Sequence, residues 1–271
     1  MNAAQTDLRA LESLLAFWTD SGAEGVLLDA PIDRIAEGQR LPARTAPAPR
    51  MPAPAVPGVR AAPEASAAVA DAQSLAAAAA DLTALAAAIA AFDGCGLKFE
   101  GAKQAVFARG NPQGPVMVVG EGPGTDEDAQ GAPFVGRAGK LLDRMLKAAG
   151  LEGRVFITNT VFWRPPGNRT PSAVEQMACA PFLQRAIALV QPKALLLVGG
   201  ASAKSVLKRE EGILSLRGRW FDWSPQDGGP PIPAMPTLHP AFLLRQPGAK
   251  KRAWGDLLTL VERLDRPERP D

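Results

Sequence analysis

Histidine, cysteine and tyrosine are scarce in this sequence: its 271 residues include one histidine, two cysteines and no tyrosine. Two cysteines cannot form a disulfide framework, and they cannot complete a four-cysteine zinc or iron–sulfur site. A single histidine excludes His-rich metal sites and any mechanism that needs two histidines in one chain. The sequence therefore belongs to neither the disulfide-stapled nor the His-rich metal classes.

Long apolar stretches are also absent. No apolar run approaches the roughly 20 residues that span a bilayer. The N-terminus, Met1-Asn2-Ala3, lacks the basic start and apolar core of a signal peptide. We therefore expect a soluble, cytoplasmic protein with no membrane partner.

Composition divides the chain into four parts. Residues 1–41 show a short helical pattern with no evident function, and residues 42–70 are rich in proline and alanine. Because that second segment has almost no large apolar side chains to bury, we predict a disordered linker there. Residues 71–92 are rich in alanine and predict a helix. Residues 93–266 have the pattern of one globular domain, a comfortable size for a single core.

Within this domain, apolar runs typical of buried strands alternate with helical patterns. The strand runs lie at 116–119, 155–157, 194–198 and 232–238, and the helical patterns at about 139–149, from Ser172 onward and at about 249–264. Such alternation predicts an α/β fold, a three-layer α/β/α sandwich around a mostly parallel sheet.

Polar segments follow all four predicted strands. Gly120 begins a Gly-Glu-Gly-Pro-Gly loop after the first, and Asn159 follows the second. Gly199 follows the third strand, and His239 follows the fourth. Because the carboxyl ends of parallel strands share one rim of the sheet, we expect these residues to converge on a ligand site there.

The glycine-rich loop does not have the pattern of a phosphate site. It has no Lys-Ser/Thr after its glycines, and its four carboxylates between residues 120 and 128 would repel phosphate. A carboxylate held by a tight backbone is suited to orienting a water or stabilising a developing cation. The alternative is a solvated acidic loop.

Three further residues on this rim have both a functional and a structural interpretation. His239 is either a catalytic group or a structural histidine. Asn159 either reads the edge of a heterocycle or ends a strand as a turn residue. Phe134, between Gly131 and Gly136, is either core or a stacking surface for a planar ligand.

Three segments resemble the family-four, thermophile-type uracil-DNA glycosylases. They are GEGPGTDEDAQGAPFVGRAGKLLDRML (120–146), NTVFWRPPGNRTP (159–171) and LHPAFLLR (238–245), and they occur in the family's order. The match covers roughly residues 93–260. The resemblance implies the glycosylase fold and the flipping of uracil out of DNA into a pocket at the strand ends.

The resemblance also implies roles for individual residues. Phe134 would stack on the uracil, Asn159 would bind its Watson–Crick edge, and backbone groups at Gly120 and Gly122 would line the pocket. The catalytic residues implied by the resemblance are Glu121, Glu127 and His239. Glu121 is our first choice for positioning the attacking water, Glu127 is the reserve, and His239 would stabilise the departing uracil anion.

The partner implied by the resemblance is uracil-containing DNA, single- or double-stranded, bound by a monomer. Leu243 would fill the gap that the flipped base leaves in the stack. The basic residues expected to hold the DNA are Arg137, Arg164, Arg169, Arg245, Lys250 and Lys251. Ala241 stands where the family commonly has serine, which removes one phosphate contact worth about 1 kcal/mol.

The sequence departs from the family at its iron–sulfur cluster. Cys95 and Cys179 match two of the four cluster cysteines, but Phe92 and Trp163 stand at the other two positions. Two thiolates cannot hold an ordinary four-iron cluster, so we predict no cofactor and an apolar filling in its place. The alternative is a degenerate cluster completed by other ligands.

The sequence as a whole predicts a DNA-repair enzyme. Such an enzyme, a uracil-DNA glycosylase, would hydrolyse the N-glycosidic bond of uracil and leave an abasic site, the first step of base excision repair. A different hypothesis is a DNA- or nucleobase-binding module of the same fold that has lost catalysis with its cluster. A phosphohydrolase-like α/β enzyme is a third, for which the sequence lacks metal and phosphate motifs.

Overall fold

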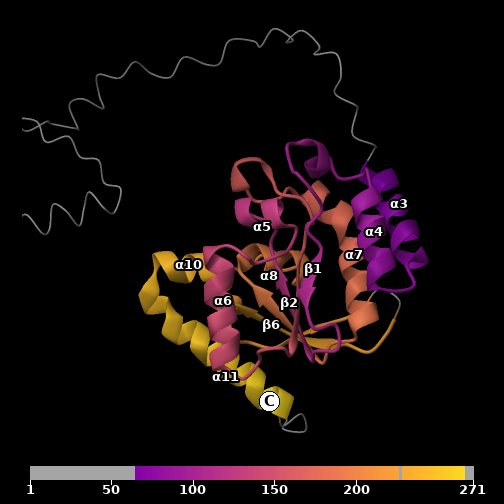
Figure 1. The fold of residues 1–271 in the computed structure, drawn as a ribbon. Helices are drawn as coiled ribbons and strands as arrows, with labels where there is room; N and C mark the ends of the chain where they lie inside the picture. The colour runs from indigo at the N-terminus through magenta and orange to yellow at the C-terminus, as the bar shows by residue number, and fades with distance from the viewer. Residues whose placement is uncertain (1–64, 226–227, 266–271) are drawn as a thin grey trace, which may run out of the picture. The chain divides into compact units, whose positions relative to one another are not determined.

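The computed structural model describes residues 65–225 and 228–265 (Figure 1). The helical pattern predicted in residues 1–41 lies outside this part, as does most of the predicted linker, residues 42–64. No helix in the described ranges is long and apolar enough to cross a membrane.

A six-stranded sheet lies at the centre, in the order β1-β3-β2-β4-β6-β5. The four inner strands are parallel, and the two short outer strands pair antiparallel at the edges. The strands are β1 (Ala108–Gly110), β2 (Val116–Gly120), β3 (Val155–Asn159), β4 (Ala194–Val198), β5 (Phe221–Trp223) and β6 (Ile232–Thr237). The predicted mostly parallel sheet is confirmed. The two edge strands were not predicted, because three residues carry too little pattern to recognise.

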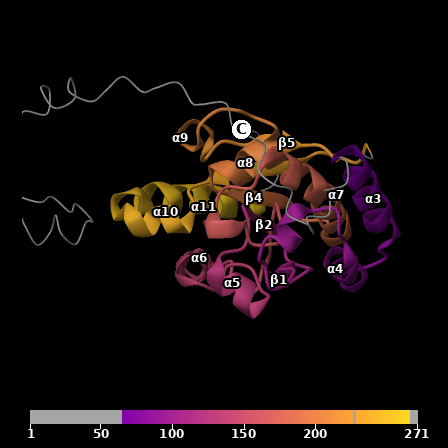
Figure 2. The same cartoon turned by 90° about the horizontal axis from the view of Figure 1, so that it is seen from above.

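Helices cover both faces of the sheet (Figures 1 and 2). On β2, Met117 and Val119 pack into the core formed with α3, α4 and α7, whereas Val116 and Val118 pack toward α6 and α11. Because β2 is buried on both faces, the side chains that alternate between the two faces are all apolar, and the strand is a continuous apolar run in the sequence. The helices on the first face are α3 (Ala65–Ala78), α4 (Leu82–Ala91) and α7 (Ala173–Val190); those on the second are α6 (Arg137–Ala148) and α11 (Lys250–Asp265).

Shorter helices connect these layers. They are η1 (Gly96–Phe99), α5 (Thr125–Gln130), η2 (Pro166–Asn168), α8 (Gly200–Leu207), α9 (Ile213–Leu216), α10 (Pro240–Arg245) and η3 (Pro247–Ala249). The predicted start of α7 is confirmed: Ser172 is its N-cap, with Glu175 completing a capping box.

The alanine-rich segment forms two helices, which corrects the single helix predicted for 71–92. The chain is already helical from Ala65, so residues 65–70 are not part of a linker. The break comes where Asp81 accepts a hydrogen bond from the Ala84 N–H (2.8 Å) and caps α4. Arg185 of α7 donates to the Ala79 carbonyl just before the break.

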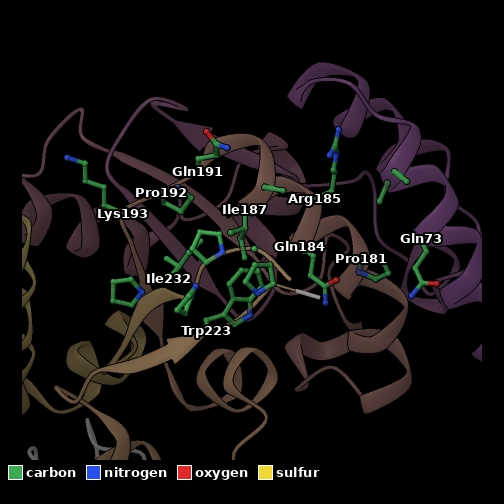
Figure 3. Close-up of a pocket in the computed structure, with 18 residues that line it drawn as sticks. Gln73, Pro181, Gln184, Arg185, Ile187, Gln191, Pro192, Lys193, Trp223 and Ile232 are labelled. Atoms are coloured by element: carbon green, nitrogen blue, oxygen red, sulfur yellow. The ribbon is translucent and has the colours of Figure 1, made fainter. Parts of the chain in front are cut away.

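One cavity lies at the amino ends of β4 and β6 (Figure 3). It measures about 720 Å³ and is bordered by α3, α7 and Trp223 of β5. None of the predicted catalytic, uracil-binding or DNA-binding residues lines it. The carboxyl ends of the parallel strands, where ligands bind in such folds, lie at the opposite end of the sheet.

Candidate active site at the carboxyl ends of the strands

A second cavity, of about 520 Å³, lies at those carboxyl ends. The predicted site residues that line it are Glu121, Gly122, Glu127, Phe134, Arg169, His239 and Arg245. They come from the segment between β2 and α6, from the loop after β3, and from the N-cap and the last residue of α10, which are distant in sequence. The expected convergence on one rim therefore occurs. Predicted site residues outside the lining are Gly120, Arg137, Asn159, Arg164, Leu243, Lys250 and Lys251.

Asn159 lies buried beside the cavity with an unsatisfied polar atom. Its side chain ends β3 and is 1% exposed, and its Oδ1 has no hydrogen-bond partner among the described residues. Gly120 packs against both this oxygen and the ring of Phe134: a Cβ at position 120 would lie 2.4 Å from Asn159 Oδ1 and 2.5 Å from Phe134 Cζ. A buried acceptor left unpaired costs about 1–3 kcal/mol, so it is poised for a donor supplied by a ligand.

Phe134 holds an unusual backbone conformation. Its φ is +55°, in the left-handed region that aromatic residues rarely adopt. The turn also brings α6 so close that a Cβ at Gly139 would lie 1.7 Å from the Phe134 carbonyl oxygen. The buried ring is tilted 30° to the imidazole of His239, with the ring centroids 5.8 Å apart.

Glu127 ties together two loops of the cavity. Its Oε1 accepts from the N–H groups of Val135 and Gly136, both at 2.9 Å, and its Oε2 accepts from the Gly124 N–H at 3.1 Å. Three backbone donors therefore engage both of its carboxylate oxygens. This fixes the glycine-rich loop against the turn that carries Phe134.

Glu121 has a different environment, because no such set of backbone donors from the described part of the chain binds its carboxylate. Burial raises the pKa of this half-buried side chain, and a hydrogen bond from Thr170 opposes the rise. The backbone at Glu121 is fixed, since its carbonyl accepts from the Thr160 hydroxyl (2.6 Å) and the Val161 N–H (3.2 Å). A carboxylate with available oxygens on a rigid backbone is suited to binding a water.

His239 is held as a neutral imidazole with a defined tautomer. Its Nδ1 accepts a hydrogen bond from the Ala241 N–H (3.1 Å), so the single proton lies on Nε2. Burial lowers its pKa to about 4, aided by the positive charge of Arg245 and opposed by Glu127. The side chain is thus a neutral hydrogen-bond donor at neutral pH.

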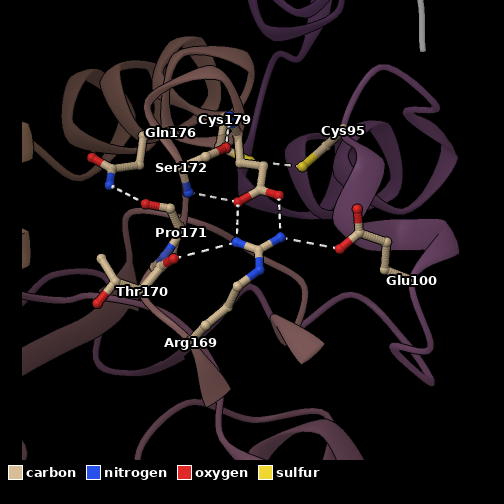
Figure 4. A network of polar contacts seen from close by, with 9 residues as sticks. Cys95, Glu100, Arg169, Thr170, Pro171, Ser172, Gln176 and Cys179 are labelled. Atoms are coloured by element: carbon tan, nitrogen blue, oxygen red, sulfur yellow. Dashed lines mark hydrogen bonds and ion pairs between the residues drawn. The ribbon is translucent and has the colours of Figure 1, made fainter. Parts of the chain in front are cut away.

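Arg169, which the sequence predicts as a DNA contact, has carboxylate partners. It forms a bidentate pair with Glu175, at 2.6 and 2.9 Å, and reaches Glu100 at 3.1 Å (Figure 4). The guanidinium in turn lowers the pKa of Glu175. Because α7 supplies Glu175, this pair anchors the 165–171 wall of the cavity to the helix.

Leu243, which the sequence predicts to fill the gap in the DNA stack, is 0% exposed and packs with Leu238 and Ala253. A side chain enclosed in the core cannot enter DNA without opening the packing around α10. The apolar side chains of that helix that reach the surface are the partly buried Phe242 and Leu244, which is 36% exposed.

Of the remaining basic residues, Arg164 donates to Asn168 Oδ1 at 2.7 Å. The others, Arg137, Arg245, Lys250 and Lys251, are exposed.

The residues at the predicted cluster positions do not fit an iron–sulfur cluster. The sulfur atoms of Cys95 and Cys179 lie 3.8 Å apart, and burial raises the pKa of the Cys179 thiol. Phe92 and Trp163 are buried in the same core, with ring centroids 6.5 Å apart. Phe182 packs 5.1 Å from Phe92. In the described ranges no three His, Cys, Asp or Glu residues group to hold a metal.

Sequence reasoning missed three residues that shape this site. Arg109 of β1 contacts the turn of Phe134, Thr170 contacts Glu121, and Glu175 holds Arg169. Thr170 lies within the 159–171 motif, so the sequence could have indicated its place at the site. Arg109 gave no signal of this role, because it acts on a distant turn that only folding brings near, whereas Glu175 lies six residues from Arg169.

Comparison with known proteins identifies close relatives. A model of the Uracil DNA glycosylase superfamily matches residues 107–258. The type-4 uracil-DNA glycosylase of Sulfurisphaera tokodaii is 40% identical over 171 residues, which are 61% of this chain and 77% of that protein. The type-4 uracil-DNA glycosylase of Saccharolobus solfataricus is 39% identical over 168 residues (60% and 77%), and that of Thermotoga maritima is 40% identical over 142 residues (52% and 71%).

The single histidine permits a direct test of the site's electrostatics. Because His239 gives the only histidine signal in NMR, its titration is unambiguous, and we expect a pKa of about 4. The unfolded chain should titrate near the ordinary value of 6.5. Acidification between these two values therefore favours the unfolded state, which takes up the proton first, and stability should fall across that window.

Arg245→Gln should raise this pKa, since it removes a nearby positive charge. Arg144→Gln, an exposed arginine of α6, is the control and should leave it unchanged. A native pKa at or above 6.5 would contradict this description of the cavity.

Proposed function

Because the chain belongs to the uracil-DNA glycosylase superfamily, we propose that it removes uracil from DNA by hydrolysing the N-glycosidic bond and leaving an abasic site. The observation that carries this proposal is the unpartnered Oδ1 of buried Asn159 beside the Phe134 ring. An aromatic surface next to an orphan acceptor is suited to a flat heterocycle that brings its own N–H. We propose that the enzyme acts as a monomer in the cytoplasm.

The uracil edge matches the proposed role of Asn159. The N3–H of uracil donates to Oδ1, and its O4 accepts from the side-chain amide. Cytosine presents an acceptor at N3 and an amino donor at C4, so it would leave both groups of Asn159 mismatched. Since the Oδ1 is buried, bulk water cannot supply the hydrogen bond that cytosine fails to make. The difference in binding free energy between uracil and cytosine is therefore large.

Bond cleavage generates charge on both sides of the glycosidic bond. As the bond from N1 to C1′ breaks, the electron pair leaves with uracil and the sugar becomes oxocarbenium-like. His239 donates its Nε2–H toward O2 and stabilises the departing anion. A neutral imidazole suits this role because the hydrogen bond needs a proton on Nε2 but no full proton transfer.

Glu121 completes the reaction. Its carboxylate stabilises the oxocarbenium-like sugar and orients a water for attack on C1′. The water oxygen bonds to C1′ and its proton passes to the carboxylate or to solvent, while uracil gains a proton after departure. The carboxylate of Glu121 accepts a hydrogen bond from Thr170, whereas the oxygens of Glu127 already accept three backbone hydrogen bonds, and this contrast supports the choice of Glu121. Glu127 would then hold the loops rather than the water.

We also propose that exposed basic side chains hold the DNA backbone, and that no iron–sulfur cluster is present. The proposed phosphate contacts are Arg137, Arg164, Arg245, Lys250 and Lys251. The absence of a cluster is supported by the donor set: two thiols, with Phe92 and Trp163 packed beside them. Their apolar volume supplies the packing that a buried cluster would otherwise provide.

Release of free uracil from a uracil-containing oligonucleotide tests the function. We expect the wild-type protein to release it without added metal, from single- and double-stranded substrate. Glu121→Gln and His239→Ala should each slow release by about a hundredfold or more, since each removes preorganised transition-state stabilisation. Glu152→Gln is a matched control, because that carboxylate is exposed and pairs with Lys147 on the surface.

An intact substrate after long incubation with wild-type protein would overturn the proposal. If the protein also shifted the oligonucleotide in a gel, the binding-module alternative would replace it. Full activity in both site variants would show that the function is right and the residue roles are wrong.

The salt dependence of DNA binding separates phosphate contacts from structural ion pairs. Each phosphate contact contributes about 0.9 to the slope of log K against log salt concentration. Lys251→Gln should lower the slope by about that amount. Arg169→Gln should leave it unchanged, because its guanidinium is engaged by Glu175 and Glu100. Equal reductions in both variants would restore Arg169 as a DNA contact.

An iron assay with a visible spectrum tests the missing cluster. We expect no stoichiometric iron and no iron–sulfur absorption in protein purified anaerobically. The control is the double variant Phe92→Cys with Trp163→Cys, which gives four thiols together with Cys95 and Cys179. Stoichiometric iron in the wild type that disappears in Cys95→Ser would establish a degenerate cluster instead.

A further inference from the structure

Arg109, on the edge strand β1, reaches across to the turn that carries Phe134. Its Nε donates to the Pro133 carbonyl at 2.7 Å, and its Nη2 donates to the Phe134 carbonyl at 3.0 Å. The same Nη2 pairs with Asp143 of α6 at 2.7 Å. One partly buried guanidinium thus binds two consecutive carbonyls of this turn and the helix that follows it.

The turn needs such support because its conformation is unfavourable by itself. A non-glycine residue in the left-handed region costs about 1–3 kcal/mol and persists only where its surroundings determine it. Glu127 fixes the N–H groups of Val135 and Gly136, which follow Phe134. Arg109 fixes the carbonyls of Pro133 and Phe134 itself. The peptide groups on both sides of the strained residue are therefore held, by side chains of opposite charge from different elements.

We propose that Arg109 is a positioning residue for the reaction: it holds the Phe134 ring in the orientation that stacks on the flipped base. This inference rests on the proposed function, since it assigns to Arg109 a part in base binding. Arg109 does not line the cavity and acts only through Phe134. Its donors are directed to two carbonyls and a carboxylate, so it is not a phosphate contact.

Arg109→Gln removes the bidentate bridge. The ring would then sample other orientations, and a misplaced stacking surface weakens binding of the base in the transition state. We expect kcat/KM for uracil release to fall by about ten- to a hundredfold. The inhibition constant of free uracil should rise in parallel, because the product stacks on the same ring. Arg109→Lys has a single ammonium group in place of the guanidinium, and its kcat/KM should lie between those of the wild type and Arg109→Gln.

A double-mutant cycle with Phe134→Ala gives the decisive readout. If Arg109 acts through the ring, Arg109→Gln should cause little further loss of kcat/KM in the Phe134→Ala background. Arg144→Gln is the control arginine, exposed on the same helix that carries Asp143. The salt slope of DNA binding should be unchanged by Arg109→Gln. Thermal unfolding of every variant monitors folding, and Arg109→Lys carries the test if Arg109→Gln does not fold.

The outcomes separate this inference from the proposed function. If the wild type does not release uracil, the proposed function fails. If the wild type is active and Arg109→Gln matches it in kcat/KM and in uracil inhibition, the role of Arg109 is wrong. An undiminished effect of Arg109→Gln in the Phe134→Ala background, or a lowered salt slope, would likewise overturn it.

Discussion

The rest of the site depends on the hydrogen bonds that the Glu127 carboxylate accepts. By accepting N–H groups from Gly124, Val135 and Gly136, it joins the loop after β2 to the turn before α6. The cavity between these segments keeps its shape because neither can move without breaking hydrogen bonds to a charged group, which are among the stronger ones in proteins. These hydrogen bonds also stabilise the left-handed backbone conformation of Phe134.

Burial in the cavity also shifts the pKa values of the two side chains that we propose as reactive. Burial raises the pKa of Glu121 and lowers that of His239, so the same partial exclusion of water acts on an acid and on a base. Burial lowers the pKa of His239 to about 4, so the imidazole is neutral at neutral pH and its Nε2–H can donate a hydrogen bond. For the glutamate, Thr170 opposes the change. The proposed reaction therefore uses a neutral imidazole beside a carboxyl group whose pKa is raised by burial.

Beyond the cavity, aromatic packing and an ion pair connect the N-terminal helices to the site. Phe92, Trp163 and Phe182 form one buried group around Cys95 and Cys179. Next to it, Arg169 links Glu175 of α7 and Glu100 to the wall of the cavity. Apolar packing at Trp163 and charged hydrogen bonds at Arg169 therefore both support the segment after β3 that borders the cavity.

The sequence by itself determined the parallel centre of the sheet and the placing of Glu121, Phe134 and His239 at one cavity. It could do so because buried strands and glycine-rich loops leave local patterns, and because three motifs are distinctive together. Only the tertiary structure decided that Leu243 lies in the core and that Arg169 binds carboxylates. It also decided that Arg109 holds the Phe134 turn. Burial and pairing of a long side chain depend on which distant segments fold against it, and Arg109 lies 25 residues from Phe134. Spacing along a chain carries no record of such partners.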